Sequence, residues 1–163
     1  VPVAGGAGGV GRQGGAWCWG VPAAVGAKLE APARSGLGVA GDGDIRVTCE
    51  ERATEGGAGA APIVLVLNEG RYGTIRMHQE RTFPGRVAAT ELANPDFVQL
   101  AEAFGFHGER VSHTSDFASA FERAASAPGG ALIELVIDVE ALTPRQTLSQ
   151  RRQAALARAD AAG

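Results

Sequence analysis

The sequence predicts an α/β domain in which helices cover both faces of a largely parallel β-sheet. A continuous apolar run at residues 63–67 is typical of a strand that is buried on both faces, as in parallel sheets, and residues 132–137 predict a further strand. Segments of helical composition alternate with these strands, which is the order found in α/β domains. A length of 163 residues favours one domain.

Local signals predict the first elements of the chain. A helix follows Pro22 and ends before Pro32, because proline fits the first turn of a helix but cannot continue one. A short strand is expected at residues 37–40. The next helix is expected over residues 48–55, where Gly56-Gly57 stops it.

Three further helices are predicted in the second half. Asn94 is the expected N-cap of a helix that starts at Pro95 and ends near Gly105. Ser115-Asp116 opens another helix that continues through Ala127, and the Arg-rich tail from Pro144 is helical in composition.

Composition and charge exclude several classes of protein. A net charge of -3 and a pI near 5.6 disfavour a nucleic-acid partner. The longest apolar run, residues 60–67, is far shorter than the about 20 residues of a membrane helix. Cys18 and Cys49 fit no metal or redox spacing and are interpreted as reduced thiols of a cytoplasmic protein.

The N-terminal segment, residues 1–14, is Gly-rich and is separated here from the main domain, residues 15–163. Residues 6–11 match G-x-G-x-x-G and Glu30 follows about twenty residues later, as in nicotinamide-binding domains. The flanking sequence is a poor strand and a poor helix, so a chance match is the favoured interpretation. Because the chain begins at Val1 and its single methionine is Met77, we expect a fragment or one part of a larger enzyme.

Oxygen ligands follow two of the predicted strands. Asp42 comes after residues 37–40, and Asn68-Glu69 come after residues 63–67. The carboxyl ends of parallel strands share one edge of the sheet, where ligands bind. Carboxylates suit Mg²⁺, so the pattern predicts a metal-bridged diphosphate site, with a tight turn around a solvated Asp42 as the alternative.

These motifs resemble a known family. Gly41-Asp42-Gly43, a spacer of 24 residues and then Asn68 are similar to the thiamine diphosphate signature, G-D-G followed by a pair of asparagines. Residues 19–29 and 66–76 resemble the same family: the C-terminal, diphosphate-binding domain of the acetolactate synthase and benzoylformate decarboxylase group. The similarity runs from about residue 14 to the tail and implies the thiamine diphosphate-binding domain fold.

The resemblance implies a role for each matching residue. Asp42 corresponds to the first metal ligand, Glu69 stands at the position of the second asparagine, and the backbone carbonyl of Arg71 corresponds to the third ligand. Trp17 stands where an apolar residue supports the bent cofactor, and the carbonyl of Gly15 accepts a hydrogen bond from its aminopyrimidine. The implied cofactor-binding residues are Gly15, Trp17, Gly41, Asp42, Gly43, Asp44, Asn68, Glu69 and Arg71.

The chain also departs from the family pattern. Glu69 replaces an amide with a carboxylate and adds negative charge beside a diphosphate. Cys18 and Trp17 stand where the family has Gly and a smaller apolar residue, and residues 55–60 are a poor end for a crossover helix. These departures favour a second interpretation, a degenerate non-catalytic interaction module of the same fold.

The resemblance further implies a 2-oxo-acid decarboxylase or acetolactate synthase-like enzyme that uses Mg²⁺ and thiamine diphosphate. In that family the activating glutamate lies in a pyrimidine-binding domain of the same or a neighbouring subunit. We therefore expect no catalytic residue in this chain, a small 2-oxo acid as substrate, and a homo-oligomer. The side chains interpreted as exposed on helices, with substrate or partner contact as the alternative, are His78, Gln79, Glu80, Arg145, Arg151, Arg152 and Arg158.

Overall fold

The computed structural model describes residues 2–3, 7–9, 17–60, 62–141 and 143–161. Its strands are β1 (Pro2–Val3), β2 (Ala7–Gly8), β3 (Leu37–Gly41), β4 (Ile63–Asn68), β5 (His107–Val111) and β6 (Ala131–Val136). Its helices are α1 (Gly20–Glu30), α2 (Asp42–Thr48), α3 (Glu51–Ala58), α4 (Gly73–Thr82), α5 (Phe97–Ala103), α6 (Phe117–Ser126) and α7 (Leu148–Asp160), with a 3-10 helix at Thr114–Asp116. No helix in this part of the chain is long and apolar enough to cross a bilayer.

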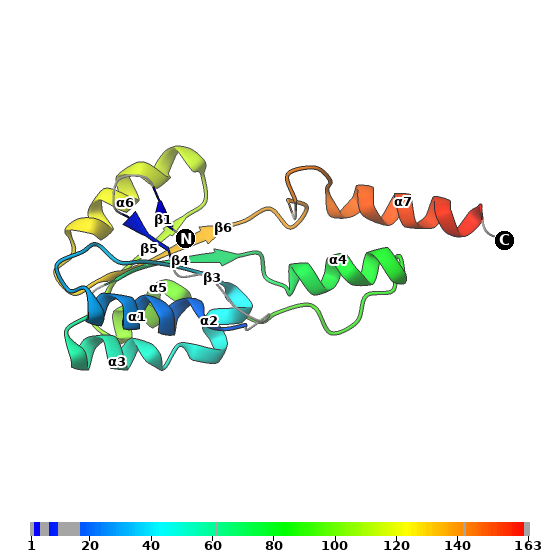
Figure 1. Cartoon of the computed structure of the whole chain (residues 1–163). Coiled ribbons are helices and arrows are strands. Elements are labelled where there is room, and N and C mark those ends of the chain that lie inside the picture. Colours follow the sequence, from blue (N-terminus) through cyan, green and yellow to red (C-terminus); the bar gives the residue numbers. More distant parts are fainter. Residues whose placement is uncertain (1, 4–6, 10–16, 61, 142, 162–163) are drawn as a thin grey trace.

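The central sheet is parallel, with the strand order β3-β4-β6-β5 (Figure 1). Gly41 pairs with Leu67, so the carboxyl ends of β3 and β4 lie side by side. The prediction of an α/β domain with a largely parallel sheet is confirmed. The separate β1–β2 pair is antiparallel, and residues 6, 10 and 11 of the G-x-G-x-x-G match lie outside the described residues.

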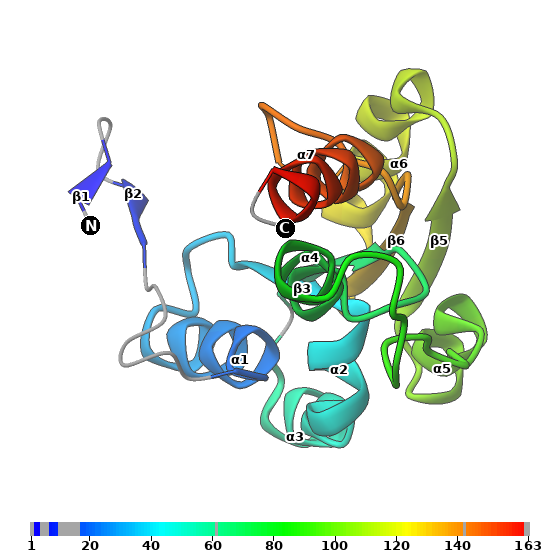
Figure 2. The same cartoon turned by 90° about the vertical axis from the view of Figure 1, so that its right-hand side faces the viewer.

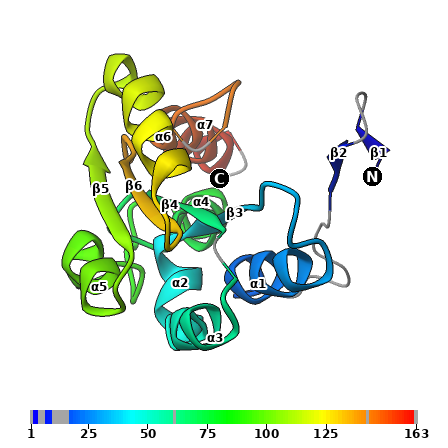
Figure 3. The ribbon, with the colours of Figure 1, turned by 90° about the vertical axis from the view of Figure 1, so that its left-hand side faces the viewer.

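Helices lie on both faces of the sheet, as predicted (Figure 3). One face is covered by α1, α2, α3 and α5 and contains the main core, including Val64, Val66 and Leu132. On the other face α6 packs over β5 and β6. It does not cover β3, where Leu37 and Val39 remain 53% and 52% exposed. The second face is therefore only half covered by the described residues.

The region after β3 differs from the prediction of one helix over residues 48–55. Helix α2 begins at Asp42, directly after the strand, and α3 continues through Gly56-Gly57 to end at Gly59, whose φ is +67°. Arg52 and Glu55 are fully buried, pair at 2.8 Å and hold α3 in place, with Arg52 stacked over a ring of the core. Burial raises the pKa of Glu55 to about 7, although Arg52 lowers it.

The region before α5 also differs. The N-cap is Asp96, which accepts hydrogen bonds from the backbone N–H groups of Val98 and Gln99 at 3.0 and 3.2 Å. The prediction of Asn94 as N-cap is wrong, because its side chain makes tertiary contacts described below. Strand β5 was not predicted: it is an edge strand whose polar sequence, His-Gly-Glu-Arg-Val, lacks the apolar run of a buried strand.

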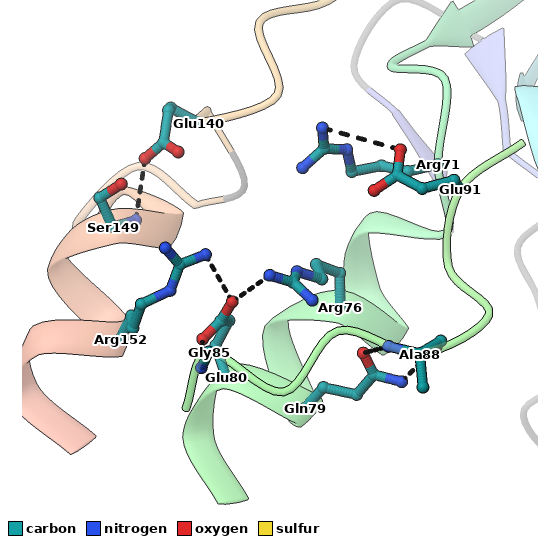
Figure 4. A network of polar contacts seen from close by, with 10 residues as sticks. All are labelled: Arg71, Arg76, Gln79, Glu80, Gly85, Ala88, Glu91, Glu140, Ser149 and Arg152. Carbon is teal, nitrogen blue, oxygen red and sulfur yellow. Dashed lines mark hydrogen bonds and ion pairs between the residues drawn. The ribbon is translucent and has the colours of Figure 1, made fainter. Parts of the chain in front are cut away.

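Helices α4 and α7 lie side by side and project beyond the sheet (Figures 1 and 2). Glu80 of α4 is fully buried between them, so the prediction of an exposed side chain is wrong. Figure 4 shows that Glu80 accepts hydrogen bonds from Arg76, from Arg152 at 2.6 Å and from the backbone N–H of Gly85 at 2.8 Å. The contact with Arg152 is the main cause that lowers the pKa of Glu80.

Substituting Glu80 tests whether it holds α4 and α7 together. We expect Glu80→Ala to lower the free energy of unfolding by about 3 kcal/mol, because it leaves buried Arg76 without its partner. The value is at the low end of the range for buried pairs, since Arg152 is 37% exposed. The control is Glu91→Ala: Glu91 is 65% exposed and pairs with Arg71 at 4.0 Å, so its loss costs less than about 1 kcal/mol in urea denaturation. Equal losses in the two variants would contradict the assigned role.

Candidate functional site

A cavity of about 90 Å³ lies at the carboxyl ends of β3 and β4. Its lining consists of Trp17, Gly41, Asp42, Gly43, Asp44, Glu69, Arg71, Tyr72, Gly73, Thr74 and Ile75. Seven of the nine predicted cofactor-binding residues are in this set. Asn68 is not in this lining, but it and Asp42 accept hydrogen bonds from the same backbone N–H, that of Gly70. Gly15 lies outside the described residues. A larger depression of about 620 Å³ beside α6 contains none of the predicted site residues.

Asp42 is the first residue of α2 and is only 3% exposed. Its Oδ1 accepts a hydrogen bond from the backbone N–H of Gly43 at 2.9 Å. Its Oδ2 accepts from the backbone N–H of Gly70 at 2.9 Å and from the side-chain amide of Asn94 at 2.7 Å. The alternative of a solvated aspartate in a turn is wrong, because the carboxylate is buried and bonded on both oxygens.

Asn68 is joined to the same donors from the end of β4. Its Oδ1 accepts from the backbone N–H of Gly70 at 3.1 Å and from the amide of Asn94 at 2.9 Å. Its own amide donates to Glu134 at 2.6 Å, and Arg110 donates to the other oxygen of Glu134 at 2.7 Å. A polar chain therefore extends from the cavity wall across β4 and β6 to β5.

Sequence reasoning missed three members of this chain: Asn94, Glu134 and Arg110. Asn94 was interpreted as a helix cap, which its residue type and position fitted equally well. Glu134 did carry a signal, since it is the single charge in the apolar run of β6, and a buried charge needs a partner. Arg110 belongs to the strand that was not predicted.

Glu69 is half-buried and faces the same cavity as Asp42. Burial, followed by the negative charge of Asp42, raises the pKa of Glu69, while the backbone N–H of Gly73 and the charge of Arg71 lower it. A Cβ at position 73 would collide with the Glu69 carboxylate, so a larger residue there would require this side chain to move. The carboxylate thus occupies space against the start of α4.

Gly43 is also held close to a neighbour. A Cβ added there would lie 2.5 Å from Cε1 of Tyr72, so this side of Gly43 is covered by the tyrosine ring. Asp44 is engaged as well: its Oδ1 accepts from the backbone N–H of Cys18 at 3.3 Å, and its Oδ2 accepts from that of Gly41 at 3.4 Å. Asp44 therefore anchors the Trp17–Cys18 segment to α2.

The oxygen donors of the cavity fit a hard divalent cation. Two acidic residues, Asp42 and Glu69, belong to one cavity lining together with Arg71, whose backbone carbonyl is the implied third ligand. Within the described ranges no three His, Cys, Asp or Glu side chains cluster closely enough to hold a metal. Mg²⁺ needs only one or two protein carboxylates when phosphate oxygens and water complete its shell, so the donor set is compatible with that ion.

Comparison with known proteins agrees with the family resemblance of the sequence motifs. A family model described as "Thiamine pyrophosphate enzyme, C-terminal TPP binding domain" matches residues 12–135. The chain is 32% identical over 131 residues to the mitochondrial acetolactate synthase catalytic subunit of Aspergillus candidus. The aligned region covers 80% of this chain and 18% of that protein. It is 31% identical over 121 residues to the acetolactate synthase isozyme 2 large subunit of Escherichia coli K12, covering 74% and 22%.

Solved structures agree with the sequence relatives. The thiamine diphosphate-dependent 4-hydroxybenzoylformate decarboxylase of Rhodococcus jostii RHA1 superposes with a TM-score of 0.70 and 32% identity. The match covers 75% of this chain and 23% of that chain. The present chain therefore spans about a fifth of the length of the relatives that it matches.

Replacing Cys18 tests the strain in the segment that Asp44 anchors. Cys18 has a φ of +61°, a left-handed conformation that costs a residue with a Cβ roughly 1–2 kcal/mol. Cys18→Gly removes this cost but adds about 0.4–1 kcal/mol of unfolded-state entropy, so we expect a net stabilisation of about 0.5–1 kcal/mol in chemical denaturation. Cys18→Ala retains the Cβ and is the control. A glycine variant no more stable than the alanine variant would refute this account.

Proposed function

Because the chain belongs to the thiamine pyrophosphate enzyme family as a C-terminal TPP binding domain, we propose that it binds thiamine diphosphate through Mg²⁺. The observation that carries the proposal is the single cavity lined by Asp42, Glu69 and Arg71 at two adjacent strand ends. In this proposal the two carboxylates and the Arg71 carbonyl hold the cation. Gly41, Gly43 and Asp44 lie beside the diphosphate, and Trp17 and Gly15 contact the rest of the cofactor.

The proposed reaction is that of a 2-oxo-acid decarboxylase or acetolactate synthase-like enzyme. When bound, the thiazolium ring of the cofactor supplies the electron sink for loss of CO₂ from a small 2-oxo acid. The residues of this chain bind the metal and orient the diphosphate. The activating glutamate comes from a pyrimidine-binding domain of the same or a neighbouring subunit, which makes a homo-oligomer the expected assembly. The free thiols of Cys18 and Cys49 support a cytoplasmic location.

A second candidate function is a non-catalytic interaction module that has lost the cofactor. Two observations favour it: Glu69 brings a second carboxylate beside Asp42, and the cavity of about 90 Å³ is small and partly filled by side chains. Calorimetric titration with thiamine diphosphate separates the two functions. Heat that depends on Mg²⁺ and disappears with EDTA supports the cofactor site, and its absence at millimolar cofactor supports the interaction module.

Removing Asp42 tests the metal ligand directly. We expect Asp42→Ala to weaken Mg²⁺-dependent binding of thiamine diphosphate by more than about 100-fold, beyond the about 10–100-fold cost of losing an outer-shell partner. The N–H of Gly70 and the amide of Asn94 still donate to Asn68 when Asp42 is removed, so neither donor is left unpaired. Circular dichroism should therefore show a folded protein. Asp42→Asn preserves the side-chain shape and serves as the second variant. Parental affinity in both folded variants would rule out Asp42 as a ligand.

Restoring the family residue tests the charge at position 69. Glu69→Asn keeps an oxygen ligand and removes a negative charge beside both Asp42 and the diphosphate, so cofactor should bind at least as tightly as in the parent. Glu69→Ala, which removes the oxygen altogether, is the comparison and should bind more weakly. Isothermal titration at fixed Mg²⁺ measures both. Clear weakening in the asparagine variant would mean that the carboxylate is an adapted ligand.

A further inference from the structure

We infer that Asn94 is a positioning residue for the proposed metal site, holding the Asp42 carboxylate in one orientation. The inference rests on the proposed function, because it concerns how the metal ligand is held. Asn94 lies 52 positions from Asp42 in the sequence, in the loop before α5, yet its amide donates to Asp42 Oδ2 at 2.7 Å. Asn94 thus contacts Asp42, the proposed metal ligand, but does not itself line the cavity.

The hydrogen-bond count determines which oxygen of Asp42 remains available. Oδ2 accepts two donors, from Gly70 and Asn94, and so uses both of its lone pairs. Oδ1 accepts one donor, from Gly43, and keeps one lone pair. A cation therefore finds its coordination site on Oδ1. Without Asn94, Oδ2 regains a lone pair and the carboxylate loses one of the bonds that fix its rotation.

The amide of Asn94 has one possible orientation. Its NH₂ group has two hydrogens and two acceptors, Asp42 Oδ2 at 2.7 Å and Asn68 Oδ1 at 2.9 Å. Rotation by 180° would place the carbonyl oxygen of Asn94 against two acceptor oxygens, which is repulsive. That carbonyl oxygen is instead buried without a hydrogen-bond partner among the described residues. The fold thus leaves one polar atom unpaired in order to keep the NH₂ group against Asp42.

The other acceptor is fixed from behind. Asn68 donates to Glu134, which is 2% exposed, and Arg110 holds Glu134 in turn. This direction of the Asn68 amide turns its oxygen toward Asn94. Arg110 also pairs at 3.2 Å with Asp96, the N-cap two residues after Asn94. Both the side chain and the loop of Asn94 are therefore tied to the sheet, which suits a residue that positions another.

The test is a Mg²⁺ titration of the full chain at fixed thiamine diphosphate, followed by tryptophan fluorescence, to which Trp17 in the cavity wall and Trp19 both contribute. For Asn94→Ala we expect the half-saturating Mg²⁺ concentration to rise by about 10–100-fold, as for loss of an outer-shell partner. Asn94→Asp should raise it further, because it opposes a carboxylate to Asp42. At saturating Mg²⁺ the affinity of Asn94→Ala for the cofactor should return to the parental value, which general damage to the fold would not allow.

The matched control is Gln150→Glu, which makes the same amide-to-acid change on an exposed position of α7. Its side-chain oxygen accepts from the backbone N–H of Thr147, and glutamate retains that bond. We expect parental Mg²⁺ dependence in this variant. Should Asn94→Asp fail to fold, Asn94→Ala decides.

Two negative outcomes are distinguishable. If the parent binds cofactor with Mg²⁺ and the Asn94 variants need no more Mg²⁺ than it does, Asn94 has no positioning role and the proposed function stands. If the parent shows no Mg²⁺-dependent binding, the proposed function and this inference fail together. A lower melting temperature with unchanged Mg²⁺ dependence also overturns the inference, because it marks a purely structural role.

Discussion

The ends of β3 and β4 are held together by hydrogen-bond donors that two acceptors share. The backbone N–H of Gly70 and the amide of Asn94 each donate to both Asp42 and Asn68. The parallel register sets the two acceptors next to each other, and the donors then offset the cost of burying a carboxylate. This bonded pair positions the cavity wall at the ends of the two strands. It therefore fixes Asp42, a ligand of the proposed cation site, in the fold.

The apolar strands and the placement of the site were predictable, since both follow from local pattern. A continuous apolar run marked β4, a run interrupted only by Glu134 marked β6, and polar residues at strand exits marked the edge where Asp42 and Glu69 line one cavity. The misses have one physical cause, which is tertiary contact overriding local preference. Asn94 could cap a helix or bond to Asp42, and only the packed structure decides between these uses. Likewise, a buried ion pair stabilises α3, which continues through two glycines. Glu80 is buried because it pairs with Arg152, 72 positions away in the sequence.

Glu69 alters the electrostatics of the site more than its geometry. It lines the cavity where the proposed ligand belongs, and its pKa is raised by burial and by Asp42. The part of this rise that comes from the charge of Asp42 means that the two carboxylates disfavour each other when both are ionised. A divalent cation between them would reverse this sign, because its charge favours ionised ligands. With asparagine at position 69, less of the binding energy would depend on the metal. Glu69 therefore makes the proposed site more dependent on Mg²⁺ than the family pattern.

The same contacts fit a binding role for the carboxylates of the cavity. Asp42 is bonded on both oxygens, and Asp44 accepts from the backbone of Cys18 and Gly41. The pKa of Glu69 is raised, mainly by burial, and ligation of a cation would favour its ionised form. In the proposed function Asp42 and Glu69 hold a cation, and the acid–base group comes from the other part of a shared active site. The chain spans about a fifth of the length of its relatives.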